Sequence, residues 1–75
     1  MNVIIYTTPF CQWCKATKEF LAKKKIKFTE KDVSKNKKLV QEMVKKSGQY
    51  GVPVLDIQGK IIIGYNQEEI EKTVG

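Results

Sequence analysis

The feature that most constrains this chain is its pair of cysteines, Cys11 and Cys14, in the spacing Cys-x-x-Cys. They are the only cysteines among 75 residues, and they separate an apolar run at 3–6 from a stretch with helical periodicity. A thiol at a strand-to-helix junction meets the unsatisfied N–H groups and the positive dipole end of the helix, which favour its thiolate form. A thiol three residues later can close a disulfide with it. The spacing therefore predicts dithiol–disulfide exchange, with Cys11 as the nucleophile and Cys14 as the resolving thiol.

Length and composition predict one domain over residues 1–75. The longest apolar runs hold three or four residues, and the N-terminus has no basic start followed by a long apolar segment. We therefore expect a cytoplasmic protein that does not enter a membrane. In that reducing compartment, two close cysteines are typical of catalysis or metal binding rather than of a structural disulfide. A structural zinc site needs four ligands, and the chain has no third cysteine and no histidine, so we predict no metal site.

The net charge of +6 comes from lysine alone, since the sequence contains neither arginine nor histidine. Much of this charge lies in runs at 23–25 and 35–38, which we interpret as solvated helix ends and faces. Nucleic acid is not an expected partner, because bidentate arginine contacts are impossible and no aromatic residue is interleaved with the lysines. A positive field favours anionic thiol substrates.

Hydrophobic periodicity predicts seven elements in the order β-α-β-α-β-β-α. The strands are expected at 2–7, 26–29, 54–57 and 61–63, and the helices at 12–25, at 35–47 and after Asn66 as far as Val74. Ser34 is expected to cap the second helix, and Asn66, with Glu69 three residues later, the third. Gln58-Gly59 is expected to form a hairpin turn. The first strand–helix–strand unit should be parallel and right-handed, and the last hairpin antiparallel.

With this order of elements, the chain resembles the glutaredoxins, small members of the thioredoxin fold, over essentially its whole length. Three motifs carry the resemblance: Tyr6 followed by Cys11-x-x-Cys14, the segment Gly51-Val52-Pro53, and Gly64-Tyr65-Asn66 before the last helix. The resemblance implies an α/β thioredoxin-like fold with a four-stranded mixed sheet of order 2-1-3-4. It also implies three helices, with the first and third on one face of the sheet and the second on the other.

The same resemblance implies a thiol–disulfide oxidoreductase that acts, as a monomer, on disulfide-containing proteins or small disulfides. Its electron donor would be glutathione, as a reducing co-substrate rather than a tightly bound cofactor, or thioredoxin reductase. The glutathione-using members usually have Pro-Tyr at Gln12-Trp13, often a basic residue at Thr8 and commonly an aspartate at Asn66. Residues 14–18 are instead similar to the small redoxins that thioredoxin reductase recharges, although the tryptophan- and serine-containing motif of those redoxins is missing. The donor therefore stays open.

Besides the cysteines, the residues expected to bind substrate are Tyr6, Thr8, Phe10, Gln12, Trp13, Val52, Pro53, Gly64, Tyr65 and Asn66. The resemblance implies that the Tyr6 ring lies beside the cysteines, although Tyr6 could equally belong to the core. It also implies a cis Val52-Pro53 bond that faces them and leaves the Val52 backbone free to pair with a substrate. Free N–H groups at the helix start after Asn66 are expected to hold a substrate carboxylate, unless Asn66 is only the helix cap.

A second class of function also fits a Cys-x-x-Cys pair. Small domains with the order β-α-β-β-α-β carry soft metal ions on such a pair. The predicted β-β-α ending and the Val52-Pro53 segment of this chain favour the oxidoreductase instead. Within the glutaredoxin-like fold, an iron–sulfur cluster bridged between two chains by Cys11 and glutathione stays open as an alternative.

Overall fold

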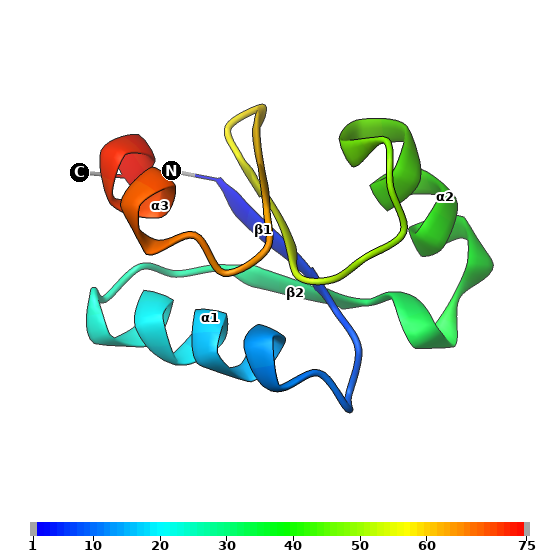
Figure 1. The fold of residues 1–75 in the computed structure, drawn as a ribbon, viewed down its shortest axis with the longest axis horizontal. Helices are drawn as coiled ribbons and strands as arrows, with labels where there is room; N and C mark the ends of the chain where they lie inside the picture. Colours follow the sequence, from blue (N-terminus) through cyan, green and yellow to red (C-terminus); the bar gives the residue numbers. More distant parts are fainter. Residues whose placement is uncertain (1, 75) are drawn as a thin grey trace.

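Four strands form one mixed sheet in the computed structural model, which describes residues 2–74. The central strand β1 (Val3–Thr7) pairs in parallel with β2 (Thr29–Asp32) and antiparallel with β3 (Val54–Ile57). The edge strand β4 (Lys60–Ile63) pairs antiparallel with β3, so the sheet order is β2-β1-β3-β4 (Figure 1). The predicted thioredoxin-like topology is confirmed, together with the order of its elements.

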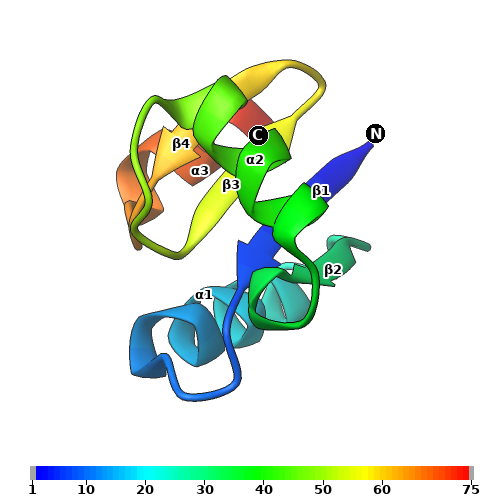
Figure 2. The ribbon, with the colours of Figure 1, turned by 90° about the vertical axis from the view of Figure 1, so that its right-hand side faces the viewer.

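Helices cover both faces of this sheet. α1 (Gln12–Lys23) and α3 (Gln67–Val74) pack on one face, and α2 (Lys37–Ser47) packs on the other (Figure 1, Figure 2). Successive residues of β1 point to opposite faces, as in any strand. Ile5 therefore belongs to the apolar cluster beneath α1 and α3, whereas Tyr6 belongs to the cluster beneath α2. None of the helices within residues 2–74 combines the length and the apolar character needed to cross a bilayer.

α1 ends at Lys23, two residues before the predicted end. Lys25 adopts a positive φ of 58°, its N–H donates to the Ala22 carbonyl over 3.0 Å, and the Ile26 N–H donates to the Leu21 carbonyl over 2.9 Å. These two bonds close the helix in a Schellman turn, a motif that usually has glycine at the position of Lys25. The lysine run gave no sign of this turn, because lysine is a good helix former.

The second strand was predicted at 26–29, which is wrong: β2 covers Thr29–Asp32. Pairing with β1 begins where Thr29 stands opposite Ile4. Ile26 and Phe28 are half-buried and pack against the cluster beneath α1 and α3. The alternation of apolar and polar residues at 26–29 therefore reflects apolar packing of the segment between α1 and β2, and not the hydrogen bonding of a strand.

Ser34 does not cap the second helix, contrary to the prediction. Its hydroxyl donates to Asp32 within a short 3₁₀ turn, η1 (Val33–Lys35), and Asp32 also accepts the Ser34 N–H over 2.9 Å. The chain then extends through Asn36, whose side-chain oxygen accepts the Lys38 N–H over 2.8 Å. Because the 3₁₀ turn buries Val33 beneath α2, α2 begins only at Lys37, with Asn36 as its cap.

The hairpin turn and the last cap lie where the sequence placed them. Gln58 and Gly59 have φ values of 51° and 94°, the positive values that a two-residue hairpin turn requires. The side-chain oxygen of Asn66 accepts the Glu69 N–H over 3.1 Å and so caps α3. The Asn66 N–H is bonded to the Gly64 carbonyl, and the Glu69 carboxylate lies 3.9 Å from the Lys60 ammonium. Only the asparagine half of a capping box is therefore formed.

Candidate active site

Cys11 occupies the N-cap position of α1. Its backbone is extended, with φ −102° and ψ 110°, and its sulfur accepts a hydrogen bond from the Cys14 backbone N–H over 3.1 Å. The first turn of α1 contains no acidic residue, and the Cys11 side chain is partly exposed. A negative charge on this sulfur is stabilised by the N–H donor and by the positive end of the helix dipole. A substrate disulfide can approach it from solvent.

Cys14 lies in the first turn of α1 and is almost entirely buried, with 1% of its surface exposed. Its burial, and next its hydrogen bond with Cys11, raise the pKa of the Cys14 thiol to about 12. The Thr8 backbone acts in the opposite direction, but its effect is smaller. At neutral pH Cys14 is therefore a protonated, shielded thiol. The two cysteines therefore differ in access to solvent, as a first and a second nucleophile must.

A groove of about 290 Å³ lies beside this pair, lined by Trp13, Val52, Pro53, Gly64 and Tyr65. The Val52-Pro53 bond is cis, as the resemblance implied. The Val52 carbonyl oxygen is 3.9 Å from the Cys11 sulfur, and the rings of Trp13 and Tyr65 are 6.1 Å apart. Five of the predicted binding residues thus line one groove, and its Val52 edge reaches the exposed thiol.

The start of α3 is fixed to this groove through Gly64. The Gly64 N–H donates to the Pro53 carbonyl over 2.8 Å, with Gly64 at a positive φ of 80°. Asn66 follows as the cap of α3, and the first turn of the helix carries Glu68 and Glu69. These two carboxylates weaken the attraction of the helix start for an anion. The site expected to hold a substrate carboxylate is therefore less positive than the cap motif alone indicated.

The remaining predicted residues stand on the rim of the site. Phe10 precedes Cys11 and is 97% exposed, and the Trp13 side chain is 56% exposed. Gln12 is exposed as the first residue of α1, and Thr8 is half-buried at the end of β1. These four rim residues are therefore uncharged, and two of them present aromatic rings to a partner.

Comparison with known proteins now decides the family, because the glutaredoxin family model matches residues 3–62. The chain belongs to the glutaredoxin family. It is 49% identical over 70 residues, which make up 93% of each chain, to a protein of Clostridium pasteurianum described as an uncharacterized glutaredoxin-like 8.6 kDa protein in rubredoxin operon. It is 36% identical over 63 residues to glutaredoxin 3 of Escherichia coli K12, covering 84% of this chain and 76% of the relative.

The structural comparison agrees with the family. The glutaredoxin of Archaeoglobus fulgidus, known from a crystal structure, matches with a TM-score of 0.90 at 31% identity, over 96% of this chain and 84% of that one. The protein is thus a glutaredoxin-family thiol–disulfide oxidoreductase with a Cys-x-x-Cys pair on a thioredoxin-like fold. The order β-β-α at its end is also not that of the small metal-carrying domains considered above.

Tyr6 of this glutaredoxin is fully buried in the cluster beneath α2, and it does not line the groove. Its hydroxyl is hydrogen-bonded to Glu42, and it accepts a bond of 2.9 Å from the Lys46 ammonium. The core alternative therefore describes the place of Tyr6 better than the expectation of a ring beside the cysteines. The alternation of β1 explains this, because Tyr6 points to the face opposite α1.

Sequence reasoning missed the polar network that Tyr6 joins. The Lys46 ammonium also donates to Asp56 over 2.7 Å, and the Lys31 ammonium donates to Glu42 over 2.9 Å. The hydrogen bond to Asp56 is the main reason that the pKa of Lys46 is raised, and the same bond lowers the pKa of Asp56. These residues lie far apart in the sequence, and the lysines were interpreted as solvated surface residues. The sequence pattern therefore did not predict the network.

Proposed function

We propose that this glutaredoxin reduces disulfides of proteins and small molecules in the cytoplasm, with Cys11 as nucleophile and Cys14 as resolving thiol. One observation carries the proposal. The Cys11 sulfur is a partly exposed helix cap that accepts the Cys14 N–H, while the Cys14 thiol is buried behind it and has a raised pKa. Only the Cys11 sulfur is therefore open to a substrate, and a reducing compartment keeps the pair available as thiols.

The reaction balances as two exchanges. The Cys11 thiolate attacks one substrate sulfur, so that a bond from Cys11 to substrate forms, the substrate disulfide breaks, and the released thiolate takes a proton from water. Cys14 then loses its proton and attacks the Cys11 sulfur. The Cys11–Cys14 disulfide forms and the second substrate thiolate leaves. The substrate gains two electrons and the enzyme loses two.

The groove beside Cys11 suits a peptide that carries the disulfide. The Val52 backbone, 3.9 Å from the Cys11 sulfur, offers a carbonyl to pair with the backbone on one side of the attacked sulfur. Trp13 and Tyr65 offer aromatic surface on the other side, and Phe10 extends this surface into solvent. Protein disulfides with apolar neighbours are therefore favoured over small charged ones.

The electron donor follows from the charges around the site. Glutathione carries two carboxylates, yet the site offers the uncharged Thr8 and a helix start with two glutamates. Glutathione then serves as a weak co-substrate, attracted by the general lysine charge, and its rate falls steeply as salt screens that charge. We expect Thr8→Lys to raise glutathione-dependent turnover. No gain in that variant, with efficient turnover of the wild type by thioredoxin reductase, would make the reductase the donor.

Substitution of each cysteine by serine tests the proposed roles of the two thiols. Cys11→Ser should abolish disulfide reduction, whereas Cys14→Ser should form a stable mixed disulfide and stay active wherever an external thiol resolves it. Iodoacetamide at neutral pH should modify Cys11 of the reduced wild type first, as measured by peptide mass spectrometry. Prior labelling of Cys14 would reverse the assignment. Visible colour in anaerobically purified protein would favour the iron–sulfur alternative.

A further inference from the structure

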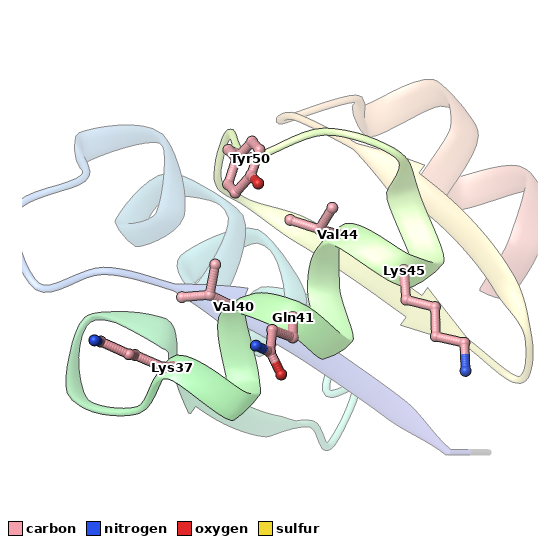
Figure 3. Close-up of a pocket in the computed structure, with 6 residues that line it drawn as sticks. All are labelled: Lys37, Val40, Gln41, Val44, Lys45 and Tyr50. Atoms are coloured by element: carbon pink, nitrogen blue, oxygen red, sulfur yellow. The ribbon is translucent and has the colours of Figure 1, made fainter.

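A second hollow, larger than the groove beside Cys11, lies on the outer side of α2. It measures about 450 Å³ and is lined by Lys37, Val40, Gln41, Val44, Lys45 and Tyr50 (Figure 3). Five of these residues belong to α2, and the sixth stands on the loop that connects α2 to β3. None of them is among the predicted substrate-binding residues, so this α2 groove is separate from the site described above.

The α2 groove has an apolar floor and one aromatic wall. Val40 and Val44 lie one helical turn apart and are half-buried, and Figure 3 shows the Tyr50 ring beside Val44 on the same side of α2. Tyr50 itself is 75% exposed. A single exposed aromatic residue is common on protein surfaces, but here the ring borders a hollow with apolar side chains along its floor.

The loop that carries Tyr50 is held by its own hydrogen bonds. The Gln49 side chain accepts the Gly51 N–H over 2.6 Å and donates to the Gly51 carbonyl over 2.9 Å, so it bridges across Tyr50. A Cβ on residue 51 would stand 2.7 Å from the Gln49 side-chain oxygen, so this bridge requires glycine there. Ser47 adds a bond to the Gln49 carbonyl at 3.0 Å. The aromatic wall is therefore preorganised, which lowers the entropy lost on binding.

Two lysines stand at the ends of the α2 groove. Lys37 and Lys45 are exposed, lie at opposite ends of the view in Figure 3, and form no salt bridge within the part of the chain that the structure describes. Glu42, the acidic residue of α2, is already engaged by Tyr6 and Lys31. Lys45 lies eight positions after Lys37 in the helix, a rise of about 12 Å. The chain has a net charge of +6, so a second copy is repelled from this rim.

We propose that the α2 groove docks an extended acidic segment of the disulfide-bearing partner protein, with the pattern acidic-x-apolar-x-acidic. In a strand, residues i, i+2 and i+4 share one face, and i and i+4 lie about 13 Å apart. That span matches the axial rise between the two lysines. Figure 3 shows Gln41 on the line between them and Val40, Val44 and Tyr50 to one side of it, so the apolar residue packs against the edge of the valine and tyrosine surface. That the partner bears a disulfide rests on the oxidoreductase function proposed above. The chemistry of the segment rests on the groove alone.

The position of the loop links this docking surface to the reaction. Tyr50 is two residues from Val52, whose carbonyl oxygen lies 3.9 Å from the Cys11 sulfur. A disulfide a few residues away from a segment seated against Tyr50 can therefore reach Cys11. Docking at α2 would raise the effective concentration of one particular disulfide without any new contact at the cysteines.

Binding is tested with a synthetic probe, Gly-Glu-Ser-Leu-Ser-Glu-Gly, titrated into ¹⁵N-labelled wild-type protein. The amide signals of Val40, Val44 and Tyr50 should move, and replacing both glutamates of the probe by glutamine should weaken binding about tenfold, as loss of two exposed ion pairs predicts. The double variant K37Q/K45Q should lose the same affinity. The matched control K23Q/K27Q, with the same change of charge away from the groove, should bind the probe like the wild type.

Three binding results would overturn the proposal. The first is equal weakening in both double variants, which would indicate charge without a site. The second is displacement of the probe by single-stranded DNA at equal concentration, which would assign the lysine surface to nucleic acid. The third is dimerisation of the free protein with loss of the Tyr50 signal, which would mean that a second copy covers the groove.

Reduction kinetics then separate docking from the oxidoreductase function. The probe is joined through a glycine–serine linker to a cysteine in a mixed disulfide, and 2-hydroxyethyl disulfide serves as the small substrate. K37Q/K45Q should lower kcat/KM for the linked substrate about tenfold and leave the small substrate unchanged. If the wild type reduces neither substrate, the oxidoreductase function fails while the titration still decides the site. If it reduces both but the linked probe gives no advantage, docking of a disulfide-bearing partner is wrong.

Discussion

The two faces of the sheet are held by different kinds of interaction. Beneath α1 and α3, the buried hydrophobic cluster is aliphatic: Val3, Ile5, Leu21, Leu55, Ile57, Ile62 and Ile70. Beneath α2, fewer residues are fully buried, and a network of charged hydrogen bonds supplements them through Tyr6, Glu42, Lys46 and Asp56. The helix that carries the cysteines is thus fixed by packing, which does not respond to pH, whereas α2 is fixed partly by charges, which do.

The α1 and α3 face also has charged contacts, but they are more open to water. Lys24 pairs with Glu71 over 2.9 Å, with the two side chains 41% and 52% exposed. Glu30 accepts from Thr7 over 2.6 Å and from Lys18 over 2.9 Å, with Glu30 39% exposed. The Asp56 side chain that binds Lys46 is only 14% exposed. An exposed ion pair contributes little to stability, and one shielded from water contributes more. The comparison therefore predicts that the two faces respond differently to substitution, acid and loss of a cap.

The largest expected effect is the truncation of the apolar face. Leu21→Ala removes a fully buried side chain of α1 from the aliphatic cluster, and such truncations cost about 3 kcal/mol of unfolding free energy. Urea unfolding followed by circular dichroism measures this loss. The loss should be the same at pH 7 and at pH 5, since no titratable group takes part. A loss that changes by half between these pH values would contradict the apolar description of this face.

The next largest effect is the loss of the network on the α2 face. Lys46→Met keeps the aliphatic part of the side chain but removes the ammonium that donates to the Asp56 carboxylate and the Tyr6 hydroxyl, while Asp56 keeps the Gly59 N–H as a donor. We expect a loss of about 2 kcal/mol, in the range for hydrogen bonds to charged groups. Lys45→Met, one residue earlier on the rim of the α2 groove, is the matched control and should change stability by less than about 0.5 kcal/mol. Equal losses in the two variants would contradict a specific network.

A smaller effect is expected in acid. The hydrogen bond with Lys46 lowers the pKa of Asp56, and the hydrogen bond with Tyr6 lowers the pKa of Glu42. Carboxylates with lowered folded-state pKa values stabilise the fold above their unfolded pKa of about 4, and this contribution is lost as pH falls through the folded value. The wild type should therefore lose more stability than Lys46→Met between about pH 6 and about pH 3. If the unfolding free energies of the two proteins fell equally with pH, the network would not be the cause of the acid sensitivity.

Much of the fold was predictable because local signals agreed with it. The spacing of Cys11 and Cys14, the turn at Gln58-Gly59 and the cap at Asn66 each act within a few residues, and each lies where the sequence placed it. The Schellman turn at Lys25 could not be predicted from the sequence, because lysine favours helix. The helix cap at Asn36 was not predicted, because Ser34, a residue of equal capping tendency, stands two positions earlier.

The misses at the site have a different cause, which is distance along the chain. Tyr6 bonds to Lys46, 40 positions away, and Lys46 bonds to Asp56, 10 positions away, so no periodicity reports either contact. The run of apolar residues in β1 also did not indicate on which face of the sheet Tyr6 lies, because apolar side chains lie on both sides of a central strand. Tyr50 lies between the predicted second helix and third strand, where no periodicity gave it a role, and the structure places it in the wall of the α2 groove beside the Gln49–Gly51 bridge.

The smallest expected effect compares the two asparagine caps, one on each face. Asn36 accepts the Lys38 N–H over 2.8 Å at the start of α2, and Asn66 accepts the Glu69 N–H over 3.1 Å at the start of α3. Replacement of either cap by alanine should cost about 1 kcal/mol in urea unfolding. Only Asn66→Ala should also raise KM for 2-hydroxyethyl disulfide, because Asn66 directly follows Gly64 and Tyr65 of the groove at Cys11. Asn66→Asp should restore the stability lost in Asn66→Ala, because aspartate caps a helix about as well as asparagine. Equal changes of KM in Asn36→Ala and Asn66→Ala would mean that the caps act through global stability alone.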